Sequence, residues 1–373
     1  MARDVRWGKP AAMLCGTLVG LILVGLGSVI LAQDAAPISR RNVDPSIPAY
    51  APPGWVSGAV VISGSDTLYP IMVRMASAFR LFKPDIKLAV QGGGSDAALK
   101  TFLQDQAFIR RGDADPNPRG HQVSGSIALL ASSRPLTNEE RKEFRSRYGF
   151  EPMEIPIALD TIAIYVNSRN PVQGLTLEQV DAIFGAERKR GLAENIRAWG
   201  QVGMEGEWAQ QPINVYGRDK QSGTRTFFIN EVLLGGTFNS TVREDRGAAL
   251  EILALSRDAF GIGYASIGFQ ASTVRVVPLA EKVGMPYILP SAESAADGTY
   301  PLSRKLYLYA RKAPGAMLDP ATLEFLKFAN SRQGQEAVVK AGAYALSAAQ
   351  IAANLQALTG TEATPLGVRA ASH

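Results

Sequence analysis

One local pattern recurs along this chain and constrains its fold more than any other feature. A short apolar strand ends in a small polar loop, and a helix begins at that loop. The loops are GSDT at 64–67, GGGS at 92–95, SSR at 132–134 and SGT at 222–224. Strand, loop and helix alternate in this way in the α/β class, whose mainly parallel sheets are flanked by helices. The pattern therefore predicts an α/β fold with its polar loops at the carboxyl ends of the strands.

Length and composition limit the possible classes of protein. The chain has 373 residues, of which 46% are hydrophobic and 20% charged, so we expect a globular protein of two lobes. Cys15 is the single cysteine, and His121 and His373 are the two histidines. This inventory excludes a disulfide framework and a Cys/His zinc site, and it leaves almost no base for a Ser-His-Asp triad. We predict no metal, no cofactor and no enzymatic activity.

The N-terminus is typical of an export signal. Three basic residues precede an uncharged apolar run over 11–32, and Ala32 ends a plausible cleavage site. We predict a signal peptide over 1–32, with an uncleaved membrane anchor as the alternative. Cleavage would remove three basic residues and one acidic residue, which lowers the net charge from +5 to +3. Such a diffuse charge does not indicate nucleic-acid binding.

The remaining chain divides by its composition. A Pro-rich and mobile spacer is expected over 33–55, lobe 1 over 56–158 plus 302–348, and lobe 2 over 159–301. The apolar stretches 155–166 and 306–310 are predicted to cross between the lobes, and 243–255 is predicted to be helical. The aperiodic stretch 110–124 is expected to be a solvated insertion, with a partner contact as the alternative. We expect the Ala-rich tail, 349–373, to be weakly structured.

The polar loops have the chemistry of an oxyanion cradle. A helix N-terminus presents free N–H groups and a partial positive charge, Ser and Thr add hydroxyl donors, and Gly permits close approach. Arg218, four residues before Ser222, could add a planar guanidinium fork. Taken alone, each loop is better explained as an ordinary helix cap, and Arg218 as a surface salt-bridge partner of a residue such as Asp219. The repetition in both halves of the chain favours the cradle, since α/β sheets bind ligands at the carboxyl ends of their strands.

Asp66 is unusual in such a cradle, because a carboxylate repels an anion unless the ligand has a proton to donate. Phosphate carries such a proton at neutral pH and sulfate does not, so Asp66 would favour phosphate. The alternative is that Asp66 caps the following helix.

These loops, in this order, resemble the phosphate-binding protein of bacterial phosphate ABC transporters. The matching stretches are SGSDTLYP at 63–70, QGGGSDA at 91–97, ASSRPL at 131–136, YGRDKQSGT at 216–224 and YPLSRKLYLY at 300–309. The resemblance spans 56–348. It implies a type II periplasmic-binding fold, in which two α/β lobes joined by two crossing strands enclose a dehydrated oxyanion.

The resemblance also implies which residues hold the anion. The implied ligands, together with Asp66 from the argument above, are Thr67, Leu68, Ser95, Ser133, Arg134, Arg218, Ser222, Gly223 and Thr224. Two positions depart from the pattern of some members of the family. Ser133 stands where those members have an aspartate, and Lys220 stands where they have another. Asp66 and Asp219 lie nearby in the sequence and could replace them.

The resulting hypothesis is an exported, periplasmic and monomeric binding protein. It would capture inorganic phosphate by closure of its lobes and deliver it to the permease subunits of an ABC transporter in the inner membrane. The alternatives are a binding protein for another tetrahedral oxyanion such as sulfate, an exported phosphatase, and a membrane-tethered phosphate sensor.

Overall fold

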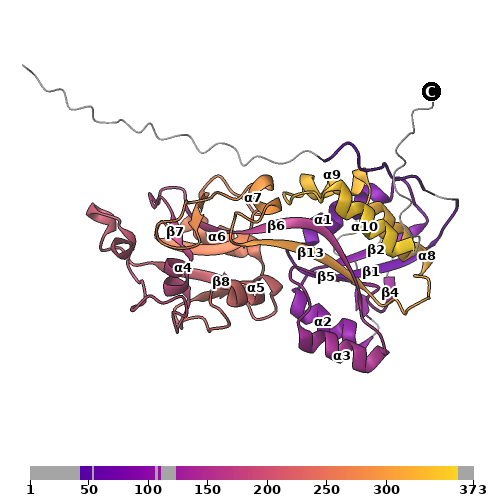
Figure 1. The fold of residues 1–373 in the computed structure, drawn as a ribbon, viewed down its shortest axis with the longest axis horizontal. Helices are drawn as coiled ribbons and strands as arrows, with labels where there is room; N and C mark the ends of the chain where they lie inside the picture. Colours follow the sequence, from indigo (N-terminus) through magenta and orange to yellow (C-terminus); the bar gives the residue numbers. More distant parts are fainter. Residues whose placement is uncertain (1–42, 53, 106–107, 111–122, 360–373) are drawn as a thin grey trace, which may run out of the picture. The chain divides into compact units, whose positions relative to one another are not determined.

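The computed structural model describes residues 43–52, 54–105, 108–110 and 123–359, and the chain is drawn as a ribbon in Figure 1. Its centre is a nine-stranded mixed sheet in the order β2-β1-β5-β13-β6-β10-β8-β9, and β11 also pairs with β6. The sheet strands are β1 (Gly58–Gly64), β2 (Ile86–Gln91), β5 (Leu129–Ser132), β6 (Met153–Asn167), β8 (Asn214–Arg218), β9 (Arg243–Asp245), β10 (Gly261–Ser266), β11 (Val274–Val277) and β13 (Ser303–Ala310). Two short pairs lie apart from it: β3 (Phe108–Arg110) with β4 (Val123–Gly125), and β7 (Leu175–Thr176) with β12 (Leu279–Ala280).

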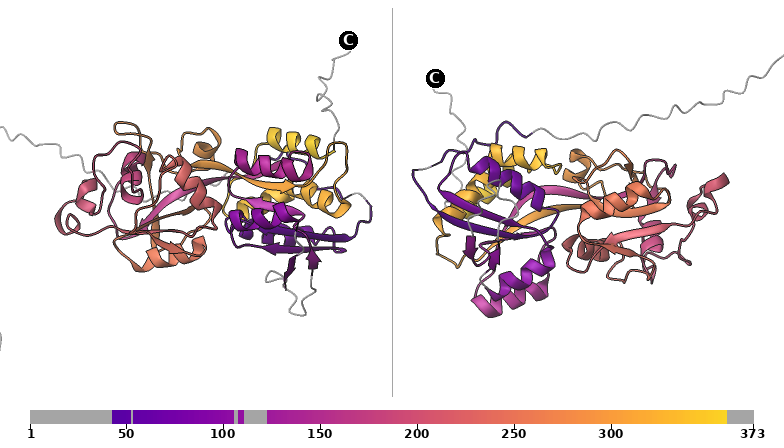
Figure 2. Two further views of the ribbon diagram at one scale, coloured as in Figure 1. Left: turned by 90° about the horizontal axis from the view of Figure 1, so that it is seen from below. Right: turned by 180° about the vertical axis from the view of Figure 1, so that it is seen from behind.

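Helices cover both faces of this sheet (Figures 1 and 2). They are α1 (Tyr69–Phe79), α2 (Ser95–Gln104), α3 (Asn138–Tyr148), α4 (Leu177–Phe184), α5 (Gly223–Glu231), α6 (Ala248–Arg257), α7 (Ala292–Ala296), α8 (Pro320–Ala329), α9 (Arg332–Lys340) and α10 (Ala348–Thr359). Most begin where the sequence supplies a cap. Thr137 and Thr176 form capping boxes, Ser222 caps α5, and Asp319 precedes a proline in the first turn of α8.

Two lobes are distinguished by their cores. Lobe 1 contains β1, β2 and β5, with one hydrophobic cluster under α1, α8 and α9 and another under α2 and α3. Lobe 2 contains β8 and β10, with one cluster under α4 and α5 and another under α6 and α7. Each lobe is therefore a sheet between two helical layers, as expected for the predicted α/β fold.

The crossing strands are β6 and β13, which pair antiparallel along their length. On β6, Ala158 packs into the core of lobe 1 and Ile162 into that of lobe 2. On β13, Leu306 belongs to lobe 1, while Leu302 just before the strand belongs to lobe 2. The two crossing strands predicted from the apolar stretches are found, each a few residues longer than expected. The exact lobe boundaries stay a prediction. The positions at which these strands leave one hydrophobic core and enter the other are consistent with it.

The prediction of a helix over 243–255 is wrong in its first part. Residues Arg243–Asp245 form β9, which pairs parallel with β8, and the helix begins only at Ala248. Gly247 lies between them with a φ of 82°, in the left-handed region that glycine tolerates. The helical spacing of the apolar residues therefore holds only on the C-terminal side of Gly247.

Two segments expected to be loose are packed. Ile47 and Tyr50, at the end of the Pro-rich spacer, are buried, and Tyr50 donates a hydrogen bond from its hydroxyl to Glu324 Oε2 at 2.7 Å. At the other end, Ala348–Thr359 form α10, whose Ile351 and Leu358 are buried. The expectation of a mobile spacer is therefore wrong for the described residues 43–52, and that of a weakly structured tail is wrong for 349–359. In both segments a few buried apolar residues hold the chain against the core, although the composition is rich in Pro or Ala.

The predicted signal peptide, the first part of the spacer and the end of the tail lie outside the described residues. So do residues 111–122 of the predicted insertion, whose flanks pair as β3 and β4. None of the helices within the described ranges has the length and hydrophobicity needed to span a bilayer.

Candidate functional site

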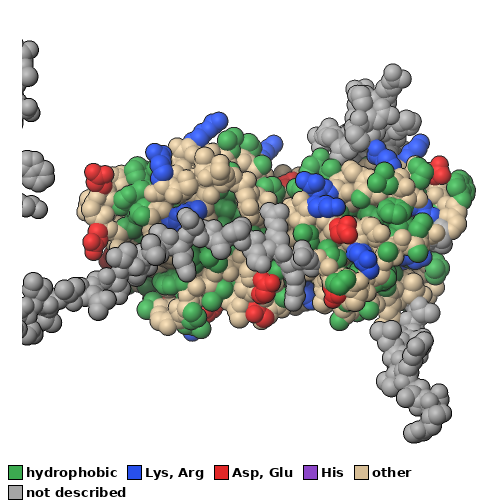
Figure 3. Space-filling view, turned by 90° about the horizontal axis from the view of Figure 1, so that it is seen from above, with side chains coloured by type: hydrophobic (Ala, Val, Ile, Leu, Met, Phe, Trp, Pro, Cys, Tyr) green, Lys and Arg blue, Asp and Glu red, His purple; other side chains and the backbone are tan. Residues whose placement is uncertain are grey.

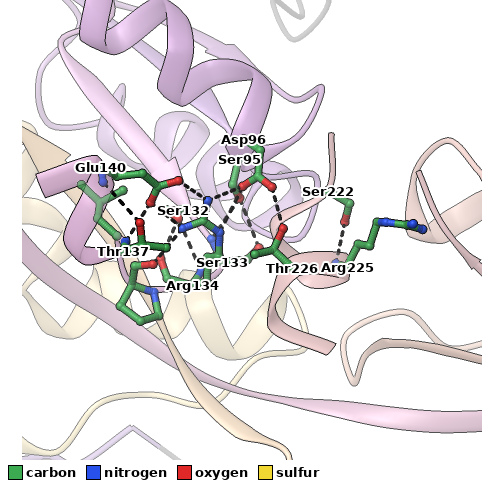
Figure 4. Close-up of polar contacts among 12 residues, drawn as sticks. Ser95, Asp96, Ser132, Ser133, Arg134, Thr137, Glu140, Ser222, Arg225 and Thr226 are labelled. Atoms are coloured by element: carbon green, nitrogen blue, oxygen red, sulfur yellow. Dashed lines mark hydrogen bonds and ion pairs between the residues drawn. The ribbon is translucent and has the colours of Figure 1, made fainter. Parts of the chain in front are cut away.

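The predicted loops meet at one place. Strands β1, β2 and β5 run parallel in lobe 1, so their carboxyl ends deliver the loops at 64–68, 92–95 and 132–134 to one edge of the sheet. From lobe 2, β8 ends at Arg218 and leads to α5. Hydrogen bonds between these loops join the two lobes, and Figure 4 shows part of this contact. The sequence therefore predicted correctly which loops come together.

The N-termini of α2 and α5 contact each other across the lobes. Ser95 Oγ lies 3.2 Å from Ser133 Oγ and accepts a hydrogen bond from the Ser133 backbone N–H at 3.2 Å. A Cβ at Gly223 would lie 2.5 Å from Ser95 Oγ and 2.9 Å from Ser133 Oγ, so only glycine fits there. The two helix ends thus place their partial positive charges side by side at the junction of the lobes, where the Asp96 N–H of α2 donates to the Gln221 carbonyl at 3.3 Å.

The two threonines predicted as ligands also meet. Thr67 Oγ1 lies 3.2 Å from Thr224 Oγ1, and both residues are buried. The guanidinium of Arg304, on β13, donates from Nη2 to Thr224 Oγ1 at 3.1 Å and to Thr67 Oγ1 at 3.4 Å.

Arg218 and Asp66 form an ion pair between the lobes. Arg218 Nη2 lies 2.9 Å from Asp66 Oδ2, and the arginine side chain is 2% exposed. Asp66 Oδ1 accepts a hydrogen bond from the Gly93 backbone N–H at 2.7 Å. The carboxylate therefore lies among the cradle loops. It does not cap α1, whose N-cap residue is Leu68 and which has no side-chain cap, so the capping alternative for Asp66 is wrong. Arg218 pairs with Asp66 and not with Asp219.

Arg134 does not face the cradle, contrary to the prediction. Its guanidinium donates to Asp96 and Glu140 on either side and to the carbonyl of Pro135, as Figure 4 shows in part. These contacts use all five N–H donors of an arginine, so none is left for an anion. Burial alone would lower the pKa of Arg134, but the two carboxylates outweigh it and hold that pKa above its ordinary value. The role of Arg134 is to fix Asp96, which in turn accepts a hydrogen bond from Thr226 of lobe 2 at 2.7 Å.

The last two predicted positions are placed as follows. Leu68 is fully buried, and its backbone N–H donates to the Ser65 carbonyl at 3.1 Å, so this N–H is engaged within its own turn. Ser222 Oγ accepts a hydrogen bond from the Arg225 backbone N–H at 3.3 Å as the cap of α5, which leaves its hydroxyl hydrogen available. Leu68 is therefore the weaker candidate and Ser222 the stronger.

The sequence reasoning missed a buried ion pair beside the threonines. Arg304 Nη2 lies 2.9 Å from Asp160 Oδ2, with side chains 1% and 0% exposed. Both residues stood in stretches already singled out, and Asp160 interrupts an otherwise apolar run, which is a signal that a carboxylate is buried with a partner. What the sequence did not show is the pairing of Asp160 with Arg304 across β6 and β13.

Some buried donors of the site are unpartnered. Arg218 Nε and Arg304 Nη1 are buried and have no hydrogen-bond partner among the described residues. Unsatisfied buried donors are costly, so such atoms indicate a site that receives an acceptor from outside the chain. In the part of the chain that the structure describes, no group of three or more His, Cys, Asp or Glu could hold a metal ion. The donor set of hydroxyls, amides and guanidinium groups fits an oxyanion better than a cation.

Comparison with known proteins shows the family of the chain. A family model described as a PBP superfamily domain matches residues 50–333. The phosphate-binding protein PstS of Pseudomonas aeruginosa is 37% identical over 313 residues, which cover 84% of this chain and 91% of that protein. The chain belongs to the PBP superfamily and, within it, to the PstS family. The resemblance found in the sequence is thereby confirmed.

Solved structures support the fold of this PstS-family chain. A putative phosphate ABC transporter substrate-binding protein with bound phosphate, from Clostridium perfringens, has a TM-score of 0.60 and 24% identity. It covers 78% of this chain and is itself covered completely. An ABC-type phosphate transport receptor from Vibrio cholerae has a TM-score of 0.57 and 25% identity, with 77% of this chain and 100% of that chain covered. The predicted two-lobed type II periplasmic-binding fold is confirmed.

Proposed function

We propose that this protein captures inorganic phosphate between its two lobes and delivers it to an ABC permease for uptake. The observation that carries the proposal is the convergence of buried donors from both lobes on one point, in a chain of the PstS family. Phosphate is held by hydroxyls, amides and a guanidinium, and no bond is made or broken. This is the chemistry of a binding protein and not of a phosphatase.

The anion contacts donors from each lobe in this proposal. Lobe 1 supplies the hydroxyls of Thr67, Ser95 and Ser133, and lobe 2 supplies those of Ser222 and Thr224. The backbone N–H groups in the first turn of α5 and the guanidinium of Arg218 complete the set. Each donor is held by an element of one lobe, so the site is complete only when the lobes are closed.

Asp66 gives the site its preference for phosphate over sulfate. Its carboxylate lies within hydrogen-bonding distance of Arg218 and Gly93, and its side chain is 28% exposed. A ligand that still carries a proton could donate it to this carboxylate, whereas fully ionised sulfate has no proton to donate and would place an acceptor oxygen against an acceptor oxygen.

Export, location and partners complete the proposal. The predicted signal over 1–32 directs the chain to the periplasm, where it acts as a monomer that docks on the permease subunits in the inner membrane. Local loops select the anion. Figure 3 is consistent with this, since basic and acidic side chains are interspersed on the face it shows.

The test is an isothermal titration of the full chain with inorganic phosphate. We expect saturable one-to-one binding, and a Kd weaker than about 1 mM, or about −4 kcal/mol, would overturn the proposal. Sulfate at a hundredfold excess should leave phosphate binding nearly unchanged. Equal competition by sulfate would make this a general oxyanion-binding protein, and turnover of a chromogenic phosphate ester would make it an enzyme.

A further inference from the structure

The buried pair Asp160–Arg304 occupies a particular position in the fold. The two residues are partners across the antiparallel strands β6 and β13. They stand where both strands pass from the core of lobe 1 to that of lobe 2, between Ala158 and Ile162 on β6. Any opening or closing of the lobes that bends these strands therefore bends them near this pair.

The guanidinium of Arg304 is held firmly on one side. Its Nε donates to Asp160 Oδ2 at 3.0 Å, and its Nη2 lies 2.9 Å from the same oxygen. Asp160 Oδ1 accepts a hydrogen bond from Ser266 Oγ, on β10, at 2.6 Å. The Arg304 guanidinium carbon also lies 5.3 Å from the centre of the Phe227 ring of α5. The group is thus oriented by three strands and one helix.

On its other side the same guanidinium contacts both lobes. Nη2 donates to Thr224 Oγ1 of lobe 2 at 3.1 Å and to Thr67 Oγ1 of lobe 1 at 3.4 Å. A guanidinium donates hydrogen bonds and accepts none. Each threonine oxygen is therefore the acceptor in its contact with Arg304. The two hydroxyls also lie 3.2 Å from each other, so one donates to the other and the second keeps its hydrogen for a ligand.

We propose that Arg304 is a positioning residue for the bound anion. By donating to Thr67 and Thr224 it occupies one lone pair of each hydroxyl oxygen and turns the hydroxyl hydrogens away from itself, and it does so only while the lobes are closed. The inference rests on the proposed phosphate site and adds a residue of the crossing strands to it. With one lone pair of each oxygen occupied by Arg304, a threonine hydroxyl whose hydrogen is free is oriented to donate it to the ligand. The carboxylate of Asp66, which only accepts hydrogen bonds, is the better acceptor for a protonated oxygen of phosphate.

A purely structural ion pair explains less of the geometry. Replacing a buried ion pair with apolar residues is often neutral or stabilising, so stability alone is a weak reason for this one. A structural pair would also not leave Arg304 Nη1 buried without a partner among the described residues. An ion pair kept for stability alone also does not explain why Arg304 contacts one hydroxyl from each lobe. Orientation of those hydroxyls for a ligand does explain it.

The test is a double-mutant cycle on phosphate affinity, measured by calorimetry on the full chain. Arg304→Lys keeps the charge, but a single ammonium cannot both hold Asp160 and reach two hydroxyls. We expect it to weaken phosphate binding at least 30-fold. In a Thr224→Val background, where the nearer hydroxyl is already gone, the same change should cost at least tenfold less. In a Thr224→Ser background, which keeps a hydroxyl, it should cost nearly the full amount.

Two outcomes would overturn the inference: Arg304→Lys binding phosphate within threefold of the unmodified chain, or equal losses in the Val and Ser backgrounds. Arg311→Lys is the matched control, because Arg311 follows β13 directly but bonds to Phe102 and Ile127 away from the cradle. It should change the affinity less than threefold. If the unmodified chain binds no phosphate, the proposed function fails, which is distinct from either outcome.

Folding is checked separately, by the melting temperature of each variant without phosphate. If Arg304→Lys does not fold, the double variant Arg304→Gln/Asp160→Asn replaces it, because removing both charges leaves no lone buried charge. We expect this folded variant to bind phosphate at least 30-fold more weakly. Affinity within threefold of the unmodified chain would again overturn the inference.

Discussion

At the scale of single residues, Arg218 contributes the main charge that faces the proposed anion. Its side chain is 2% exposed, is held by Asp66 and keeps Nε without a partner among the described residues. A guanidinium so placed offers an acceptor ligand a charge-assisted hydrogen bond in a dry environment, where such bonds are strong.

Arg218→Ala should therefore weaken phosphate binding by about 3 kcal/mol, or more than a hundredfold. Calorimetric titration measures this directly. Arg145→Ala removes an exposed arginine whose ion-pair partner, Glu151, lies six residues along the chain, and it should have no effect. An affinity of the Arg218 variant within threefold of the unmodified chain would contradict the assignment.

Glu251, on α6 behind the site, is a second residue with a measurable consequence. It is fully buried, and its Oε1 accepts a hydrogen bond from the Tyr264 backbone N–H at 2.7 Å. Burial raises the pKa of Glu251 to about 8, although Arg218 and the Tyr264 N–H oppose the shift, while Asp245 adds to it. At neutral pH the folded protein therefore holds a proton on this carboxyl that the unfolded chain has released.

The sign of the pH dependence follows from that proton. Between the ordinary glutamate pKa of 4.5 and about 8, the folded state binds the extra proton, so this group makes the free energy of unfolding fall as pH rises. Each pKa unit corresponds to about 1.4 kcal/mol, which makes the loss a few kcal/mol. Glu251→Gln cannot titrate and should show a smaller loss between pH 5 and pH 8. Urea unfolding at a series of pH values measures both curves, and parallel curves would contradict the assignment.

At the scale of elements, the contact between the N-termini of α2 and α5 decides whether the lobes can close. Gly223→Ala places a methyl group 2.5 Å from Ser95 Oγ and 2.7 Å from Ser95 Cβ, across that contact. Because the clash lies between the lobes, each lobe can still fold, and the substitution hinders the closure of the two lobes. We expect phosphate affinity to fall at least tenfold, with the melting temperature of the phosphate-free protein nearly unchanged.

Gly54→Ala is the control for this substitution, since a Cβ at Gly54 meets nothing within 4 Å. It should leave both the affinity and the melting temperature as they are. Unchanged affinity in the Gly223 variant would mean that the anion binds without the contact of the two helix ends.

The sequence predicted elements well where the local signal and the tertiary structure agree. Ser222 marks the start of α5, as expected, because the cap is a local property. The prediction was wrong for Arg243–Asp245, where pairing with β8 overrides the helical pattern. It was also wrong at Tyr50, whose ring packs against Phe79 and Phe328 from distant parts of the chain.

The same distinction applies to the candidate site. Thr67, Ser95, Ser222 and Thr224 follow from the strand-loop-helix pattern, and the structure brings their loops together. Arg134 belonged to the same pattern, but its side chain does not face the cradle, because it forms ion pairs with Asp96 and Glu140. Arg304 was missed because its place depends on the register of β13 against β6, which no local pattern reveals.

At the scale of the whole molecule, the ligand is expected to stabilise both lobes together. The donors come from both lobes, and one sheet runs through both, so an anion that binds only the closed state favours the folded protein as a unit. Phosphate at a hundred times its Kd should add about 2.7 kcal/mol to the free energy of unfolding.

Scanning calorimetry with and without phosphate measures this effect as a rise in melting temperature. The Arg218→Ala variant at the same phosphate concentration should show little rise, and so should the unmodified chain in sulfate. A melting temperature that does not depend on phosphate would contradict a site that bridges the lobes.

The position of β13 in the sheet has a consequence for the order in which the chain assembles. β13 lies between β5 and β6, although it follows all the strands of lobe 2 in the sequence. As the chain is synthesised, β5 and β6 in lobe 1 lack the partner between them until β13 emerges, whereas the strands of lobe 2 are already present. A chain ending at Leu302 should therefore protect amides of β8 and β10 from hydrogen exchange but not those of β1 and β5, and protection of all four would contradict this order. Lobe 1 is begun first and finished last, so its unpaired edges are where a nascent chain is most exposed to aggregation.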